Sequence, residues 1–199
     1  MKKITILLLI LSLQTFGQEE EKKNENFVKF DVLFRVHAIY SFQMGNYSLA
    51  KSHTTYPGIG LSMSLIDIQN FKIGAGYNLE IYDVTDHELI GNFNVSNYSS
   101  VFGTVNYEIK VLPKVSLYPN VGIGVAILHQ KSGLDSYGYQ QGTEYRAGLI
   151  TDYKVSKNVS FFFGVNYIYA KLNMDTHPDF KDYFSTAQKV QLSLGLQID

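Results

Sequence analysis

Residues 27–42 read FVKFDVLFRVHAIYSF, and this stretch decides the class of fold. Apolar side chains occupy every second position from Val28 to Phe42, while the positions between them begin with Lys29, Asp31, Leu33, Arg35 and His37. Successive side chains of a β-strand point to opposite faces, so alternation over this length predicts a long strand with one apolar face.

Similar alternation recurs along the chain, and the connections between the segments alternate in length. The expected strands are residues 27–42, 56–66, 71–82, 95–109, 115–129, 143–154, 158–172 and 187–198. Short connections at 67–70, 110–114 and 154–158 predict tight hairpin turns. Longer polar connections lie at 43–55, 83–94, 130–142 and 173–186. All four long loops therefore fall at one end of the sheet, and the turns and both termini at the other.

Side-chain size indicates which face of the strands points inward. One face carries small residues, among them Gly58, Gly60, Ser62, Ser64, Gly74, Gly76, Gly122, Gly124, Gly164 and Gly195. A narrow barrel lumen needs small residues, whereas glycine on a water-facing strand only weakens it. The opposite face is bulky and apolar, with aromatic residues toward the strand ends, which suits lipid. We predict an all-β, eight-stranded antiparallel up-and-down transmembrane β-barrel, with a soluble periplasmic β-barrel that carries a ligand as the alternative.

The first residues have the pattern of a cleavable signal peptide. Lys2 and Lys3 precede an apolar run at 4–13 that is shorter than the roughly 20 residues of a membrane-spanning helix. We expect residues 1–17 to direct export and be removed. Residues 18–26 (QEEEKKNEN) would then form a charged, flexible leader, and residues 27–199 the barrel domain, located in the outer membrane.

Composition narrows the possible functions. The absence of cysteine excludes disulfides, a thiolate metal site and a lipid-modified cysteine. Removal of Lys2 and Lys3 leaves 15 basic and 18 acidic residues, a net charge of about −3, which offers no electrostatic basis for nucleic-acid binding. No glycine-rich phosphate loop and no HxH or HExxH spacing occurs, so no cofactor and no metal site is predicted.

Two hairpins and the final segment carry a resemblance to a known family. They read VNYEIKVLPKVSLYPNVGIGV (residues 105–125), GLITDYKVSKNVSFFFGVNYIYA (148–170) and VQLSLGLQI (190–198), and they resemble the units of small OmpA/OmpX-like eight-stranded outer-membrane barrels. The resemblance implies a lipid bilayer around the barrel, insertion by the barrel-assembly machinery, and long loops available to an extracellular partner. Family members usually end on an aromatic residue that the machinery recognises, whereas this sequence ends with Ile198 and Asp199.

Ten charged or titratable residues are candidates for the lumen: Lys29, Asp31, Arg35, His37, Glu80, Glu108, Glu144, Arg146, Asp152 and Lys189. In a narrow lumen such groups must be paired and hydrogen-bonded, because a lone buried charge costs several kcal/mol. We interpret them as a polar plug that fills the barrel. The alternative is a gate or narrow ion path whose pairs exchange partners.

The expected function is that of a structural or surface-interaction protein that displays loops, without catalytic activity. The alternative is a lipid-modifying barrel enzyme that uses His129 or His37. His129 and Ser132 are the most suggestive pair, but a spacing of three does not place both on one face of a strand.

Overall fold

The chain closes into a barrel in the computed structural model, which describes residues 28–198. The expected signal peptide and leader lie outside these residues. Eight strands form the ring: β1 (Lys29–Met44), β3 (Gly58–Ile68), β4 (Phe71–Val84), β5 (Val95–Tyr107), β7 (Val115–Ser132), β8 (Asp135–Lys154), β9 (Val159–Leu172) and β10 (Thr186–Ile198). The shorter elements are α2 (Ser48–Ser52), β2 (His53–Thr55), α3 (His87–Ile90), β6 (Ile109–Leu112) and α4 (Pro178–Ser185).

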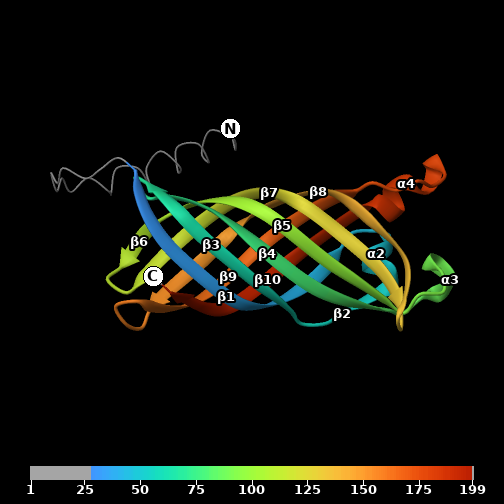
Figure 1. Cartoon of the computed structure of the whole chain (residues 1–199), viewed down its shortest axis with the longest axis horizontal. Coiled ribbons are helices and arrows are strands. Elements are labelled where there is room, and N and C mark those ends of the chain that lie inside the picture. The colour runs from blue at the N-terminus through green and yellow to red at the C-terminus, as the bar shows by residue number, and fades with distance from the viewer. Residues whose placement is uncertain (1–27, 199) are drawn as a thin grey trace, which may run out of the picture.

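The ring follows the order β1–β3–β4–β5–β7–β8–β9–β10, and every neighbouring pair is antiparallel. It closes where β1 pairs with β10, from Phe34 opposite Ile198 to Met44 opposite Gln188. Figure 1 shows the tilted strands wrapping around a long cylinder. The predicted eight-stranded up-and-down barrel is confirmed. Within residues 28–198 there is no helix long and apolar enough to cross a membrane.

The two faces of the sheet divide as the side-chain sizes predicted. On β4, Lys72, Asn78, Glu80 and Tyr82 are buried, while the residues between them, such as Ile73 and Ile81, face outward. Glycines on the inner face bring neighbouring groups close: a Cβ added at Gly76 would meet the ring of Phe102. The small residues thus make room in the lumen for large ones, and the bulky apolar residues form the exterior.

The barrel has two different ends. We call one the turn end, because it holds the β3–β4, β6–β7 and β8–β9 turns and the final residues of β10 (Figure 1). At the β3–β4 turn Gln69 and Asn70 both have positive φ, 49° and 75°, as a type I′ hairpin turn requires. We call the other the loop end, because α2, α3, α4 and the β7–β8 hairpin lie there.

Two sequence predictions about connections were wrong. Residues 130–142 are not a long loop, because β7 and β8 continue to a two-residue turn at Gly133 and Leu134. In the segment 135–141 (DSYGYQQ) only Tyr137 and Tyr139 alternate, and the glycine and polar residues around them are typical of a loop, so its period-two signal is weak. The expected strand 95–109 ends at Tyr107, and β6 pairs with β7, so only Pro113 and Lys114 make the next turn.

Candidate functional site in the lumen

A buried ion pair lies near the loop end of the lumen. Lys189 donates to Glu80 Oε1 at 2.5 Å, and both side chains are 1% exposed. Gln191 donates to the same oxygen at 3.0 Å, and the Tyr82 hydroxyl donates to Oε2 at 2.7 Å. Three donors therefore surround the Glu80 carboxylate, which is the condition under which a buried charge is tolerated.

A second charged pair lies on β8. Glu144 and Arg146 are two residues apart, share the inner face, and form a buried ion pair. The Tyr98 hydroxyl donates to the other Glu144 oxygen at 2.5 Å. The Tyr98 ring centroid lies 3.4 Å from Lys189 Nζ, and the Phe102 ring centroid lies 3.2 Å from the Arg146 guanidinium carbon. Tyr98 thus contacts both ion pairs, and aromatic faces stabilise both cations.

A third group, formed around Arg35, lies nearer the turn end. Arg35 Nε donates to Gln197 at 2.9 Å, and the guanidinium lies over the rings of Tyr118 and Phe162, at 5.2 and 5.5 Å from their centroids. A cavity of about 40 Å³, lined by both Arg35 and Arg146, lies at this level of the lumen. That volume holds on the order of one or two water molecules. The middle of the barrel is therefore filled by side chains.

A larger cavity, which we call the vestibule, lies at the turn end. Its volume is about 630 Å³. Lys72 Nζ lies 3.1 Å from Asp31, 3.0 Å from Asp67 and 3.9 Å from Glu108. Ser116 donates a further hydrogen bond of 3.3 Å to Glu108. The vestibule thus contains a cluster of one cation and several carboxylates.

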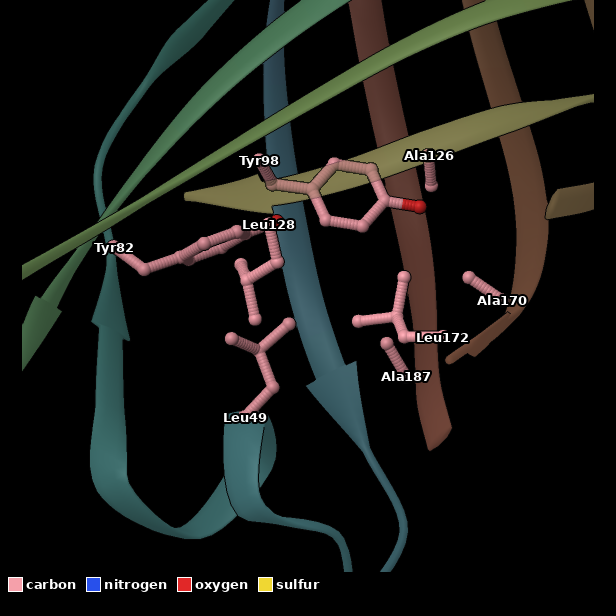
Figure 2. Packing of buried hydrophobic residues seen from close by; sticks show 8 residues of the cluster. All are labelled: Leu49, Tyr82, Tyr98, Ala126, Leu128, Ala170, Leu172 and Ala187. Atoms are coloured by element: carbon pink, nitrogen blue, oxygen red, sulfur yellow. The ribbon is translucent and has the colours of Figure 1, made fainter. Parts of the chain in front are cut away.

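Apolar side chains close the loop end of the lumen. Leu49 of α2 is 3% exposed and points into the barrel, as Figure 2 shows. We call its cluster the apolar cap: Leu49, Tyr82, Tyr98, Ala126, Leu128, Ala170, Leu172 and Ala187. Because Tyr82 and Tyr98 also bond to Glu80 and Glu144, the apolar cap is continuous with the charged pairs beneath it.

His53 connects α2 to the barrel wall. Its Nδ1 lies 3.1 Å from the Ser52 hydroxyl, and its Nε2 lies 2.9 Å from the Ser96 hydroxyl of β5. Burial lowers the pKa of His53 from 6.5 to about 4, although the Ser48 backbone and the Asp83 carboxylate act in the opposite direction. At neutral pH the imidazole is therefore uncharged.

The structure places the ten candidate residues in separate groups. Six are buried in the barrel: Arg35, Glu80, Glu144, Arg146, Asp152 and Lys189. His37 is half-buried beside the small cavity, Asp31 and Glu108 line the vestibule, and Lys29 is exposed at the turn end.

Sequence reasoning missed Lys72 and the apolar cap. Lys72 has the same strand parity as Gly74, Gly76 and Glu80, so the alternation contained the signal for it. Leu49 lies in a polar connection with no period, and nothing in the sequence singled it out.

The pair considered for catalysis is arranged differently from the sequence hypothesis. His129 Nε2 lies 2.7 Å from the hydroxyl of Ser136, across the β7–β8 hairpin, and not beside Ser132. Among residues 28–198 no carboxylate bonds to the His129 ring. In the same residues no three His, Asp or Glu side chains are grouped to hold a metal ion.

A closed ring of eight antiparallel strands, with an apolar exterior and a filled polar interior, defines a transmembrane β-barrel of the outer-membrane type. Three solved structures share the fold. Neisserial surface protein A is 13% identical, covers 84% of this chain and 96% of its own, and has a TM-score of 0.59. Ail, the attachment invasion locus protein of Yersinia pestis, is 17% identical over 85% of this chain and 98% of its own, with a TM-score of 0.52. OprG from Pseudomonas aeruginosa is 14% identical over 85% and 95%, with a TM-score of 0.51.

These structures confirm the eight-stranded barrel fold that the OmpA/OmpX-like resemblance implied. No family model matches the sequence, and no curated protein does. At these identities the likeness concerns the fold, so the function has to be argued from this chain's own surfaces.

Proposed function

We propose that the protein is a closed, rigid barrel that presents its loop end at the cell surface for interaction with an extracellular partner, without catalysing a reaction. The observation that carries this proposal is the exposure of large apolar side chains on the loop end. Leu134 is fully exposed, and Tyr139, Phe180 and Tyr137 are 71%, 57% and 55% exposed. Leu134, Tyr137 and Tyr139 lie close together in the sequence of the β7–β8 hairpin, and a concentration of exposed apolar groups is typical of an interaction site.

The length of the β7–β8 hairpin supports placing this surface outside the bilayer. A tilted strand needs about 9–11 residues to cross the membrane, whereas β7 has 18 residues and β8 has 20. β8 pairs with β9 only as far as Gly142, opposite Leu172, so residues 135–141 of the hairpin extend beyond β9 at the loop end. The hairpin tip therefore projects beyond the lipid-facing band.

The interior argues against transport and catalysis. The lumen contains three layers of bonded polar side chains and the apolar cap, which leave about 40 Å³ at mid-height. His129 contacts a serine hydroxyl but has no carboxylate to orient its ring within the described residues. A catalytic serine needs both partners, so we propose a non-enzymatic role. At 17% identity, the likeness to the attachment protein Ail adds only the shared fold.

Labelling in intact cells tests the orientation. The chain has no cysteine, so Leu134→Cys and Lys114→Cys each create a unique reactive site, one at each end. We expect a membrane-impermeant maleimide to label Leu134→Cys in intact cells and Lys114→Cys only after the outer membrane is permeabilised. The reverse pattern, or labelling of neither variant in membranes, would contradict the proposal.

Export by the signal peptide and insertion by the barrel-assembly machinery belong to the same proposal. Loss of folded barrel when that machinery is depleted tests the insertion step.

A shortened hairpin tests the interaction role. His129 and Tyr139 are directly paired, so Asn-Gly can replace residues 130–138 as a two-residue turn. Cells that display the wild-type barrel should adhere to a protein-coated or cellular surface more than cells without it. Cells with the short hairpin should lose this gain, while a gel-mobility difference between folded and heated protein shows that the barrel is intact. Equal adhesion by all three would refute the interaction role.

A further inference from the structure

The vestibule at the turn end is a blind, positively charged cup. Its volume of about 630 Å³ greatly exceeds the cavity of about 40 Å³ at mid-lumen. Leu33, Tyr118 and Gln197 line its inner part, and the Arg35 layer lies behind them. Five of its lining side chains are lysines, and three are carboxylates. A ligand in this cup would meet an excess of positive charge.

Internal contacts account for two of the five lysines, Lys72 and Lys154, and leave three others. Lys72 lies within 4 Å of Asp31, Asp67 and Glu108, so its positive charge is fully offset by these carboxylates, which outnumber it. Three lysines at the mouth form no ion pair with any residue in the range 28–198: Lys110, Lys114 and Lys157.

Two turns hold these three lysines around the mouth. Lys110 is in register with Ser116, whose hydroxyl bonds to Glu108 in the vestibule, so Lys110 is on the inner side of the β6–β7 hairpin. The Lys154 N–H donates to the Lys114 carbonyl at 2.8 Å, which fastens this turn to the end of β8. Lys157 lies in the β8–β9 turn, where two N–H groups donate to the Val159 carbonyl at 3.0 Å. The two turns therefore hold the three lysines on the lining of one cavity.

We propose that the vestibule binds a ligand that carries two or more phosphate groups, held by Lys110, Lys114 and Lys157. A lysine ammonium is a compact charge with three donors, and it binds phosphate as a point charge. No arginine lines the vestibule, so its cations are all lysines. Several ammonium groups on flexible stems fit a ligand with several phosphates. A soluble molecule or a lipid headgroup at the turn end can supply this chemistry.

Calorimetric titration with inorganic tripolyphosphate tests the soluble source, on full barrels in nanodiscs of zwitterionic lipid. The vestibule variant is K110Q/K114Q/K157Q, and the matched control K51Q/K131Q/K181Q removes three lysines at the loop end. We expect the wild type and the control to bind alike, and the vestibule variant to bind at least about tenfold more weakly, because three ammonium–phosphate contacts are lost. Gel mobility verifies folding, and K110R/K114R/K157R should restore binding.

Nanodiscs that contain cardiolipin, whose headgroup carries two phosphates, test the lipid source. If tripolyphosphate does not bind, the proposal requires cardiolipin to be enriched around the wild type and the control, as measured by mass spectrometry, and not around K110Q/K114Q/K157Q. Binding of either probe that depends on these lysines supports the site and identifies its source. Equal behaviour of all folded variants toward both probes, or no binding of either, overturns it.

Discussion

Lys189 and Glu80 form an ion pair that is almost wholly buried, so each charge depends on the other. Replacing Lys189 by Met removes the cation and leaves the Glu80 carboxylate in a low-dielectric lumen. We expect the free energy of unfolding to fall by about 3–5 kcal/mol. The double variant Glu80→Gln with Lys189→Met should recover much of this loss, because the introduced amide oxygen can accept from Gln191 and its NH2 group can donate to the Tyr82 hydroxyl oxygen. Urea unfolding in lipid vesicles measures the free energy of unfolding of both variants. An equal decrease in the single and the double variant would contradict the prediction.

Gly74 and Gly103 on neighbouring strands provide a matched pair of glycines. A Cβ at Gly74 would overlap the Met63 carbonyl oxygen, whereas a Cβ at Gly103 would have no neighbour closer than 3.9 Å. Gly74→Ala should therefore destabilise the barrel by about 1–3 kcal/mol, as overpacking does, and Gly103→Ala should have little effect. Thermal unfolding followed by gel mobility distinguishes the two. A larger loss at Gly103 would mean that lipid contact, and not strand packing, governs these positions.

The sequence predicts which face of the barrel wall a side chain lies on, but not which residue that side chain contacts. Period-two alternation was enough to place Arg35, Glu144 and Lys189 on the inner face. It could not pair Lys189 with Glu80, because these residues are 109 positions apart and meet only through the register of the closed ring. The contacts of Tyr98 with both ion pairs depend on the same register.

Among the elements, α2 determines whether the apolar cap is closed. Leu49 is its buried apolar side chain, and Leu49→Ala would leave a cavity against Leu128 and Leu172. We expect the free energy of local opening to decrease by about 2–5 kcal/mol, the usual cost of this substitution in a core. Hydrogen exchange of residues 48–55 measures the opening. The control is Leu89→Ala on α3, where the side chain is 45% exposed. Equal exchange in both variants would show that α2 does not depend on Leu49.

His53 should make the attachment of α2 sensitive to pH. Its pKa is about 4 in the folded protein and 6.5 in its usual environment, so the opened state binds more protons between these values. The stabilisation is complete above about pH 6.5, decreases as the pH falls toward 4, and is lost below that. Hydrogen exchange of residues 48–55, corrected for intrinsic rates, should show this slope in the wild type and not in His53→Gln. The same slope in both proteins would show that His53 is not its source.

The sequence predicted the strands correctly where they cross the lipid bilayer. It failed for the segments that extend beyond the bilayer. The lipid band imposes one apolar face, and all eight ring strands were visible from that period. Residues 135–141 have no such constraint, so the outer part of β8 was mistaken for a loop. α2 has five residues and α3 four, which is too short for a helical period to be recognised.

The whole molecule is a cylinder closed at several levels in series. The vestibule is open at the turn end, but the Arg35 layer, the two ion pairs and the apolar cap follow one another toward the loop end. The Arg35 layer and the two ion pairs contain different charged residues, so no single charged side chain determines whether the lumen is closed. This redundancy distinguishes a filled barrel from a gated one. In a gated barrel, a single ion pair that exchanges its partners would open a path for ions through the lumen.

Planar-bilayer recording separates these two possibilities. We expect the wild type to be silent at all voltages, because about 40 Å³ at mid-height cannot hold a continuous column of water. Leu49→Gly should also be silent, since removal of the apolar cap leaves the Glu80–Lys189 and Glu144–Arg146 pairs across the lumen. Current through Leu49→Gly alone would show that the apolar cap is the only barrier. Steady current through the wild type would support a gate whose ion pairs exchange partners, and Lys189→Met should then change its conductance.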